Sequence, residues 1–165
     1  MKSNRFSVLN ILLEIIAILG LVIQIGVLVI AWRPLPEYFP VHFDFSGQND
    51  FEGSKLDLLM LLGLSAVSYV GLTSLSFFPE KFNYPWPIQP EDSERQYSLA
   101  RGFVQLIKAE SIWIFCLIQY SIIGIGMGNM ERLPKIFIPS IILAVSTTII
   151  GYFLLATRNN QRAKF

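Results

Sequence analysis

Four long stretches of this sequence carry almost no charge, and they constrain its fold more than any other feature. Glu14 is the single charged residue among the 27 residues between Arg5 and Arg33. The other three stretches contain no charged residue and run for 22, 20 and 22 residues. They lie between Asp57 and Glu80, between Glu110 and Glu131, and between Lys135 and Arg158. A helix needs about 20 apolar residues to cross the hydrocarbon core of a membrane, so each stretch is long enough for one crossing.

The composition of the whole chain favours a membrane protein over a soluble one. Hydrophobic residues make up 53% of the 165 residues and charged residues 15%, whereas a soluble domain has about 25% charged residues. The net charge of +1 provides no basic surface for nucleic acid. Cys116 is the only cysteine, so the chain has no internal disulfide. These properties exclude a soluble enzyme domain, a disordered tail and a nucleic-acid-binding protein.

We therefore predict an all-α fold, an integral membrane bundle of four transmembrane helices with a short extracytoplasmic lid loop. The whole chain, residues 1–165, forms a single domain in this prediction, with the lipid bilayer as its first partner. The spans cover about 8–32, 56–78, 111–128 and 136–157, the outer lid covers 33–55, and an inner segment covers 79–110.

The positions of the basic residues predict which side of the membrane each segment faces. Cytoplasmic segments of membrane proteins carry an excess of Lys and Arg. Nine of the 13 basic residues fall in the N-terminal, 79–110 and C-terminal segments, and four fall in the two loops on the other side. The nine are Lys2, Arg5, Lys81, Arg95, Arg101, Lys108, Arg158, Arg162 and Lys164. We expect a plasma-membrane protein with both termini in the cytoplasm.

The inner segment is expected to have two parts. Prolines at positions 79, 85, 87 and 90 prevent residues 82–87 from forming a helix. Pro90 is followed by two acids, which predicts a helix start there, and this helix is expected to run into the third span. Arg95 and Arg101 are expected on its polar, cytosolic side. That side is either a solvated helix end or a docking face for a cytosolic partner.

The outer lid carries the most specific pattern in the chain. Val41, Phe43 and Phe45 alternate with polar residues, which is the periodicity of a β-strand. A turn is predicted at 46–50, where Gly47 can adopt a positive φ angle. We expect the aromatic side chains to face the membrane or the helices, and the polar side chains to face water or each other.

The lid also resembles a known family. The pattern comprises Leu35, Pro36, Pro40, His42, Phe43, Gly47 and Asp50, followed by Ser54 and Lys55. This LPxxxPxHFxxxGxxD pattern, together with residues 83–85 and 95–101, resembles a bacterial membrane domain of unknown function that forms the N-terminal part of SdpI-type immunity proteins. The resemblance implies a multi-pass plasma-membrane protein. For the SdpI type it implies protection against a secreted toxic peptide and membrane sequestration of a cytosolic repressor.

His42 is the only histidine, and two roles are open to it. It can titrate near neutral pH as a sensor or proton relay, or it can bond Asp44, Asp50 or a loop carbonyl and hold the lid in shape. A zinc site needs about three protein ligands, which one histidine without an outer cysteine does not supply. A calcium loop of the EF-hand type starting at Asp44 needs Gly and Glu where the chain has Asn49 and Lys55. No metal site and no cofactor are expected.

Three polar residues inside the predicted spans are further candidates. A carboxylate in hydrocarbon is costly, so Glu14 is expected to face the bundle or a partner. We expect Lys108, just below the third span, to pair with it and Glu110 to share its site. The alternative is that Glu14 is neutral or reaches towards the inner interface. Gln24 and Gln119 are expected to form hydrogen bonds between helices.

These observations predict a non-enzymatic membrane protein that binds a peptide or protein partner as an immunity, sensor or regulatory component. The lid residues expected to shape the recognition surface are Pro36, Pro40, His42, Asp44, Gly47 and Asp50. The alternative is a small transporter or an accessory subunit of a transport complex, a homo-oligomer in which Glu14 and Gln24 line a polar path. A third hypothesis is an enzyme that uses His42 with Asp44 or Asp50.

Overall fold

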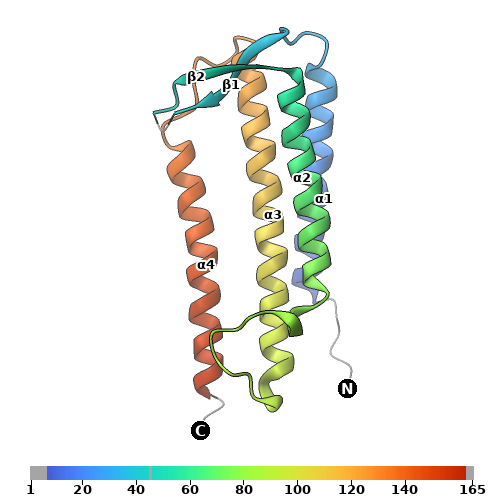
Figure 1. Ribbon diagram of the computed structural model, residues 1–165, viewed down its shortest axis with the longest axis vertical. Coiled ribbons are helices and arrows are strands. Elements are labelled where there is room, and N and C mark those ends of the chain that lie inside the picture. Colours follow the sequence, from blue (N-terminus) through green and yellow to red (C-terminus); the bar gives the residue numbers. More distant parts are fainter. Residues whose placement is uncertain (1–6, 45, 163–165) are drawn as a thin grey trace.

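Four long helices form the body of the molecule. The computed structural model describes residues 7–44 and 46–162, with the backbone alone for 159–162. The helices are α1 (Val8–Ala31), α2 (Lys55–Ser76), α3 (Ser93–Gly126) and α4 (Phe137–Arg162). Each is long and apolar enough to cross a membrane. Figure 1 shows α3 between α4 on one side and the pair α1 and α2 on the other. Lys2, Arg5, Phe45 and Lys164, which entered the predictions above, lie outside the described residues.

The helix starts follow from local side-chain chemistry. Ser54 and Asp57 form a capping box at the start of α2, in which the Asp57 carboxylate accepts the backbone N–H of Ser54 at 2.7 Å. Such caps satisfy N–H groups that the first helical turn leaves unpaired. The predicted start near Pro90 is confirmed, because the short 3-10 turn η2 (Pro90–Asp92) leads directly into α3. The third span and the helix before it are therefore one continuous element.

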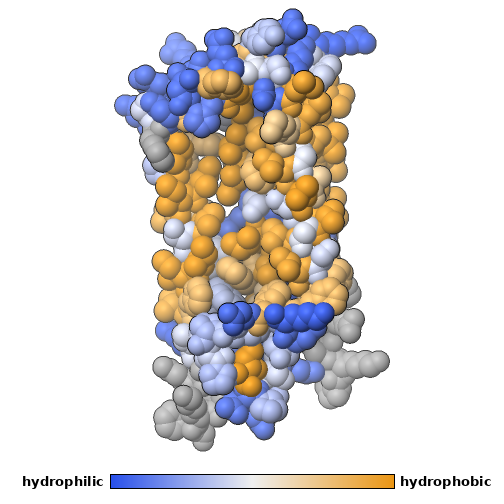
Figure 2. Space-filling model, viewed as in Figure 1, coloured by the Kyte–Doolittle hydropathy of each residue, from blue (hydrophilic) through white to orange (hydrophobic). Residues whose placement is uncertain are grey.

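The apolar interior lies in two layers along the bundle, and the outward helix faces are also apolar. One layer, near the lid, comprises Leu28, Ala31, Leu35, Phe39, Leu58, Ile122 and Ile123. The other, in the half away from the lid, comprises Leu13, Ala17, Ala109 and Ile112. We call these two ends of the bundle the lid end and the base end. Figure 2 shows an apolar band between two polar ends, which is the surface a chain needs if lipid surrounds its middle.

The lid is a β-hairpin, so the all-α prediction is wrong in this part of the chain. Strands β1 (Tyr38–Phe43) and β2 (Asn49–Ser54) pair antiparallel across the lid end. Phe39 is buried and lies close to α3: a Cβ built on Gly126 would come within 3.0 Å of the Cβ of Phe39. Tyr38 and Phe51 are exposed, so only part of the aromatic set faces the helices. The antiparallel pairing of β1 with β2, which agrees with the strand periodicity of the sequence, gives hydrogen-bond partners to backbone N–H and C=O groups of the lid.

The segment between α2 and α3 ties three helices together at the base end. It begins with the 3-10 turn η1 (Pro79–Lys81) and has no regular structure over residues 82–89, which confirms the non-helical prediction. The Trp86 ring lies edge-on to Phe153 of α4 at 6.5 Å between centroids. The Tyr84 hydroxyl donates to the carbonyl of Pro79 at 2.9 Å, and burial raises the pKa of Tyr84. Figure 1 shows this segment crossing from α2 to the base of α4 before it returns to α3.

Candidate functional site

A buried ion pair joins three helices in the base half of the bundle. Lys108 Nζ of α3 donates to Glu14 Oε2 of α1 at 2.6 Å and to Thr73 Oγ1 of α2 at 3.0 Å. The Tyr69 hydroxyl donates to Glu14 Oε1 at 2.5 Å, and its ring centroid lies 4.9 Å from Lys108 Nζ. The Lys108 side chain is fully buried, whereas that of Glu14 is 31% exposed. Buried charges need this degree of pairing because an isolated one would lose its hydration without compensation.

The predicted contact between Glu14 and Lys108 is confirmed, but one detail of the prediction is wrong. Lys108 lies on the continuous helix α3 and is fully buried inside the bundle. Glu110 does not share the site, since two helical residues are separated by about 200° around the axis. Glu110 Oε1 instead accepts the hydroxyl of Thr148 on α4, and its Oε2 is buried without a partner among the described residues.

A cleft with both apolar and polar walls leads from the base end to Glu14 of this ion pair. We call it the polar cleft. It is a cavity of about 930 Å³ between α1, α2 and α3, with Asn10, Glu14, Thr73, Ser76, Arg101 and Gln105 among its lining residues. Gln105 Nε2 donates to Ser76 Oγ at 3.2 Å, and Arg101 Nε donates to the backbone oxygen of Ser76 at 3.1 Å. Arg95 is exposed as expected, but Arg101 is only half exposed and bonds the end of α2. Arg101 thus lines the cleft at the base end, and its predicted place on a cytosolic side stays a prediction.

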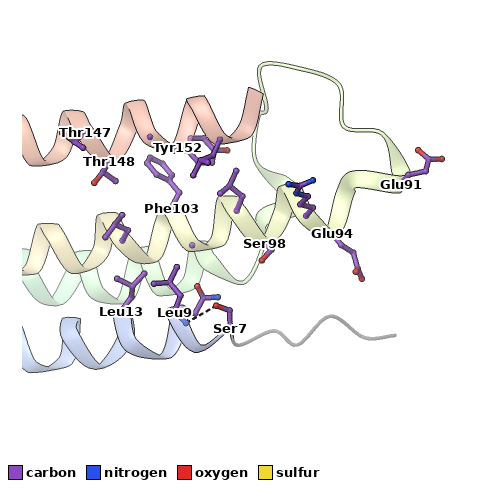
Figure 3. Close-up of a pocket in the computed structure, with 17 residues that line it drawn as sticks. Ser7, Leu9, Leu13, Glu91, Glu94, Ser98, Phe103, Thr147, Thr148 and Tyr152 are labelled. Carbon is purple, nitrogen blue, oxygen red and sulfur yellow. Dashed lines mark hydrogen bonds between the residues drawn. The ribbon is translucent and has the colours of Figure 1, made fainter. Parts of the chain in front are cut away.

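A second cavity, of about 940 Å³, opens between α1, α3 and α4. Its walls are mainly apolar, with Leu13 of α1, Phe103 of α3 and Tyr152 of α4 among them. Phe103 and Tyr152 stack at 4.4 Å between ring centroids, as Figure 3 shows from the side. The base-end mouth carries the charged residues Glu91, Glu94 and Arg95. This cavity, which we call the α4 cavity, thus combines apolar walls with a charged entrance.

Gln24 and Gln119 form the predicted bond between α1 and α3. Gln24 Nε2 donates to Gln119 Oε1 at 3.3 Å, and Gln119 Nε2 donates to the backbone oxygen of Gln24 at 2.9 Å. Both side chains are fully buried, with one apolar layer on the lid side and the other on the base side. Gln24 therefore lies apart from the polar cleft, contrary to the alternative in which it lines a path with Glu14. Among the described residues, one copy has no continuous polar path through the bundle.

Three of the six lid candidates form two local arrangements on an exposed surface. His42 Nδ1 lies 2.6 Å from Asp50 Oδ1, and both side chains are largely exposed. Asp44 bonds the turn instead, accepting the backbone N–H groups of Ser46 and Gln48, each at 2.9 Å. Of the two acids that the enzyme hypothesis pairs with His42, Asp50 therefore contacts it, while the hydrogen bonds of Asp44 are made with the turn. Within the described residues, no group of three His, Cys, Asp or Glu side chains is placed to hold a metal ion.

The remaining lid candidates are Gly47, Pro40 and Pro36, and the structure assigns a clear conformational role to the first. Gly47 is buried with a φ of +79°, and a Cβ there would come within 2.6 Å of the backbone oxygen of Leu133. Pro40 lies in β1 opposite Glu52, and Pro36 is exposed before the strand begins. The structure therefore explains the glycine at position 47 by its backbone conformation and by its close approach to Leu133.

Lowering the pH below about 4 is expected to open the 44–48 turn. The Ser46 hydroxyl and the backbone N–H groups of Gln48 and Ser46 hold the pKa of Asp44 below its usual value, which is about 3.9. A lowered folded-state pKa stabilises the turn above the unfolded value, and this stabilisation is lost as the pH falls through the folded one. NMR shifts of the Ser46 and Gln48 amides should report the change. An Asp44→Asn variant keeps an acceptor and should show no such titration; if it titrates identically, Asp44 is not responsible.

Four residues of the base-end site were not singled out from the sequence for this role: Tyr69, Thr73, Ser76 and Gln105. Their spacing does contain a signal. Positions 69, 73 and 76 fall on one face of a helix, and positions 101, 105 and 108 fall on one face of another. When two such helices pack antiparallel, the two polar rows meet.

In comparisons with known proteins, no family model, no curated protein and no solved structure matches this chain. Its function therefore has to be inferred from the chemistry of the two cavities, the ion pair and the lid.

Proposed function

We propose that this chain is a non-enzymatic, multi-pass plasma-membrane protein with cytoplasmic termini that binds an amphipathic peptide as an immunity or regulatory component. The observation that carries the proposal is the α4 cavity of about 940 Å³. Ligand pockets in proteins typically measure about 300–1,000 Å³ and combine apolar walls with a few polar groups. The α4 cavity has this character, and in the proposed orientation its charged mouth lies at the cytoplasmic surface.

The chemistry of the α4 cavity favours a peptide. Its mouth carries both signs of charge, with Glu94 beside Arg95, and the hydroxyl of Ser98 lies near them. A peptide with an apolar segment and a polar end offers amide groups and charges of both signs to such a mouth. Phe103 and Tyr152 provide large apolar surfaces deeper inside. The resemblance of the loop pattern to SdpI-type proteins, which implies protection against a secreted peptide, supports this ligand class.

Filling the α4 cavity is expected to abolish binding without disturbing the fold. Gly151 lines the cavity, and a Cβ built on it meets no atom within 4 Å. A Gly151→Leu variant should therefore fold and occupy part of the cavity. Cells that carry it should lose protection against peptides secreted by neighbouring strains by at least about tenfold. A loss of about 1.4 kcal/mol in binding free energy lowers the affinity for the peptide tenfold.

Gly71→Leu is the matched control for this experiment. Gly71 lies in the exposed face of α2, lines neither cavity, and its Cβ would also meet no atom within 4 Å. Protection should survive this substitution unchanged. Equal protection by both variants would rule out the α4 cavity as the binding site, and no protection by the unaltered chain would rule out the immunity role.

A small transporter or an accessory subunit of a transport complex is the second candidate function. The Glu14–Lys108 pair at the end of a polar cleft favours it, because ionisable residues inside membranes mark ion and proton pathways in many transporters. Since one copy has no continuous polar path, transport would require several copies or a second conformation. Unchanged ion flux into proteoliposomes after Glu14→Gln would eliminate this candidate.

A further inference from the structure

The α4 cavity is open to the side of the bundle. Helix α4 packs mainly against α3, so no extended helix contact closes the cavity between α4 and α1. Leu9 of α1 and Leu155 of α4 line the cavity, and they are 58% and 52% exposed. In the proposed orientation this opening faces the inner leaflet of the bilayer. A membrane lipid can therefore reach the cavity from the side.

The lining of this cavity changes from charged to apolar with depth. Along α3, Arg95 lies at the mouth, Ser98 follows about one turn deeper, and the apolar part runs from Leu99 to Leu106. Thr147 and Thr148 of α4 lie deeper than Ser98 (Figure 3), but their hydroxyl groups already donate within the protein. A phospholipid has the same order of chemistry, from a charged headgroup through hydrogen-bonding ester groups to apolar acyl chains.

Asn10 adds a buried amide below the mouth. It is 6% exposed, lines both the α4 cavity and the polar cleft, and its Oδ1 would lie 3.9 Å from a Cβ built on Gly102 of α3. Among the described residues, the side-chain hydrogen bonds of α1 are made by Ser7, Glu14 and Gln24, so the Asn10 amide has none. A buried amide without a partner costs free energy. Its NH₂ group can donate to an ester oxygen of a lipid.

The charged mouth determines which headgroup fits. Glu91, Glu94 and Arg95 lie there, and none of them forms an ion pair within the described part of the chain. The guanidinium of Arg95 matches a phosphate group, which it can bind through two parallel hydrogen bonds. The two carboxylates would repel a headgroup that carries only negative charge, whereas an ammonium group with N–H donors can bond to them. A quaternary ammonium lacks these donors, so the mouth favours a zwitterionic headgroup with a primary amine.

We propose that, before any peptide binds, the α4 cavity holds one phospholipid of the inner leaflet whose zwitterionic headgroup ends in a primary amine, as in phosphatidylethanolamine. Its phosphate lies at Arg95, its ammonium at Glu94, and one acyl chain along Phe103 and Leu106. This inference rests on the proposed function only for the orientation of the chain in the membrane, and it does not require a peptide ligand. A peptide that binds in the same cavity displaces the lipid.

The lipids that stay bound to the purified protein test the proposal. The full chain is reconstituted in nanodiscs that contain equal parts of phosphatidylethanolamine, phosphatidylcholine and phosphatidylglycerol with the same acyl chains. It is then transferred to a mild detergent, and native mass spectrometry counts and identifies the retained lipids. We expect one phosphatidylethanolamine per protein, at least about tenfold above each of the other two, since both competitors lack the charged hydrogen bonds of the ammonium.

Variants of the mouth test the headgroup contacts. Arg95→Gln should lower retention of phosphatidylethanolamine at least about tenfold, because the phosphate loses its charged donor. Arg132→Gln removes the same charge from an exposed position in the loop before α4 and should leave retention unchanged. Glu91→Gln/Glu94→Gln should remove the preference for phosphatidylethanolamine over phosphatidylcholine. Retention that Arg95→Gln leaves unchanged would overturn the proposal.

Variants of the wall test where the lipid lies. Gly151→Leu should abolish retention, and Gly71→Leu, outside both cavities, should not. Equal retention by these two variants, equal retention of the three lipids by the unaltered chain, or no retained lipid would each overturn the proposal. If Gly151→Leu abolishes retention while cells keep their protection, the lipid site stands and the peptide role fails. If it abolishes protection although the unaltered chain retains no lipid, the peptide role stands and the lipid site fails.

Discussion

Replacing Lys108 with methionine is expected to lower the free energy of unfolding by about 3 kcal/mol. Removing one partner of a buried ion pair typically costs about 3–5 kcal/mol, because the other charge is left without compensation. The lower end of this range applies, since Glu14 is 31% exposed and keeps its bond from Tyr69. Thr73 also loses the donor to its hydroxyl oxygen. Unfolding by SDS in mixed micelles, followed by circular dichroism, would measure the loss.

The double variant Glu14→Gln/Lys108→Met provides the decisive comparison. If the uncompensated charge causes the loss, removing both charges should recover most of the stability, because a neutral pair in the same space avoids the desolvation cost. Lys135→Met, an exposed lysine in the loop before α4, should change the stability by less than about 0.5 kcal/mol. A double variant as unstable as Lys108→Met would instead point to lost packing of the lysine stem.

Replacing Gly47 with alanine is expected to detach the lid hairpin from the loop before α4, at a cost of about 2–5 kcal/mol. A left-handed backbone costs a residue with a Cβ about 1–2 kcal/mol, and the φ of Gly47 is +79°. The new Cβ would also come within 2.6 Å of the backbone oxygen of Leu133. Overpacking of this kind adds about 1–3 kcal/mol, and a backbone atom is a poor candidate for relaxation. Hydrogen exchange of the amides in β1 and β2 should become faster, while exchange in α1 and α3 should not.

Gly128 separates the two contributions at Gly47. Its φ is +75°, but a Cβ built on it meets no atom within 4 Å. Gly128→Ala should therefore show the conformational cost alone, about 1–2 kcal/mol. If Gly47→Ala and Gly128→Ala prove equally destabilising, contact with Leu133 contributes nothing, and the attachment of the lid lies elsewhere.

The helices were predictable because their signals are local and strong. An uncharged run of at least 20 residues strongly favours a helix, since only a helix makes all its backbone hydrogen bonds within one apolar segment. Pro90 and the acids after it marked the start of α3, and the prolines of 82–87 marked the break before it. The lid was harder to classify, because its strand alternation is short. Only pairing with residues 49–54 makes it a sheet.

The candidate site was only partly predictable from the residues. Glu14 stood out because a lone carboxylate in an apolar run is costly without a partner, and Lys108 was the basic residue expected just below the third span. The angular position of Glu110, which faces Thr148, required knowing which face of α3 packs against α4. Tyr69, Thr73 and Ser76 were not singled out for this role because single hydroxyl groups in apolar helices are also common packing features.

The sequence by itself determined the number of long apolar helices, their order, the break before the third and the presence of one unpaired acid in the first. These properties depend on composition and spacing along one segment at a time. Only the tertiary structure decided which faces meet: that Lys108 is enclosed beside Glu14, that Gln24 bonds Gln119 away from the cleft, and that α4 leaves a cavity beside α3. The physical reason is that most faces of these helices are apolar, so hydrophobicity alone does not choose among packings, and the few polar groups select one by finding partners.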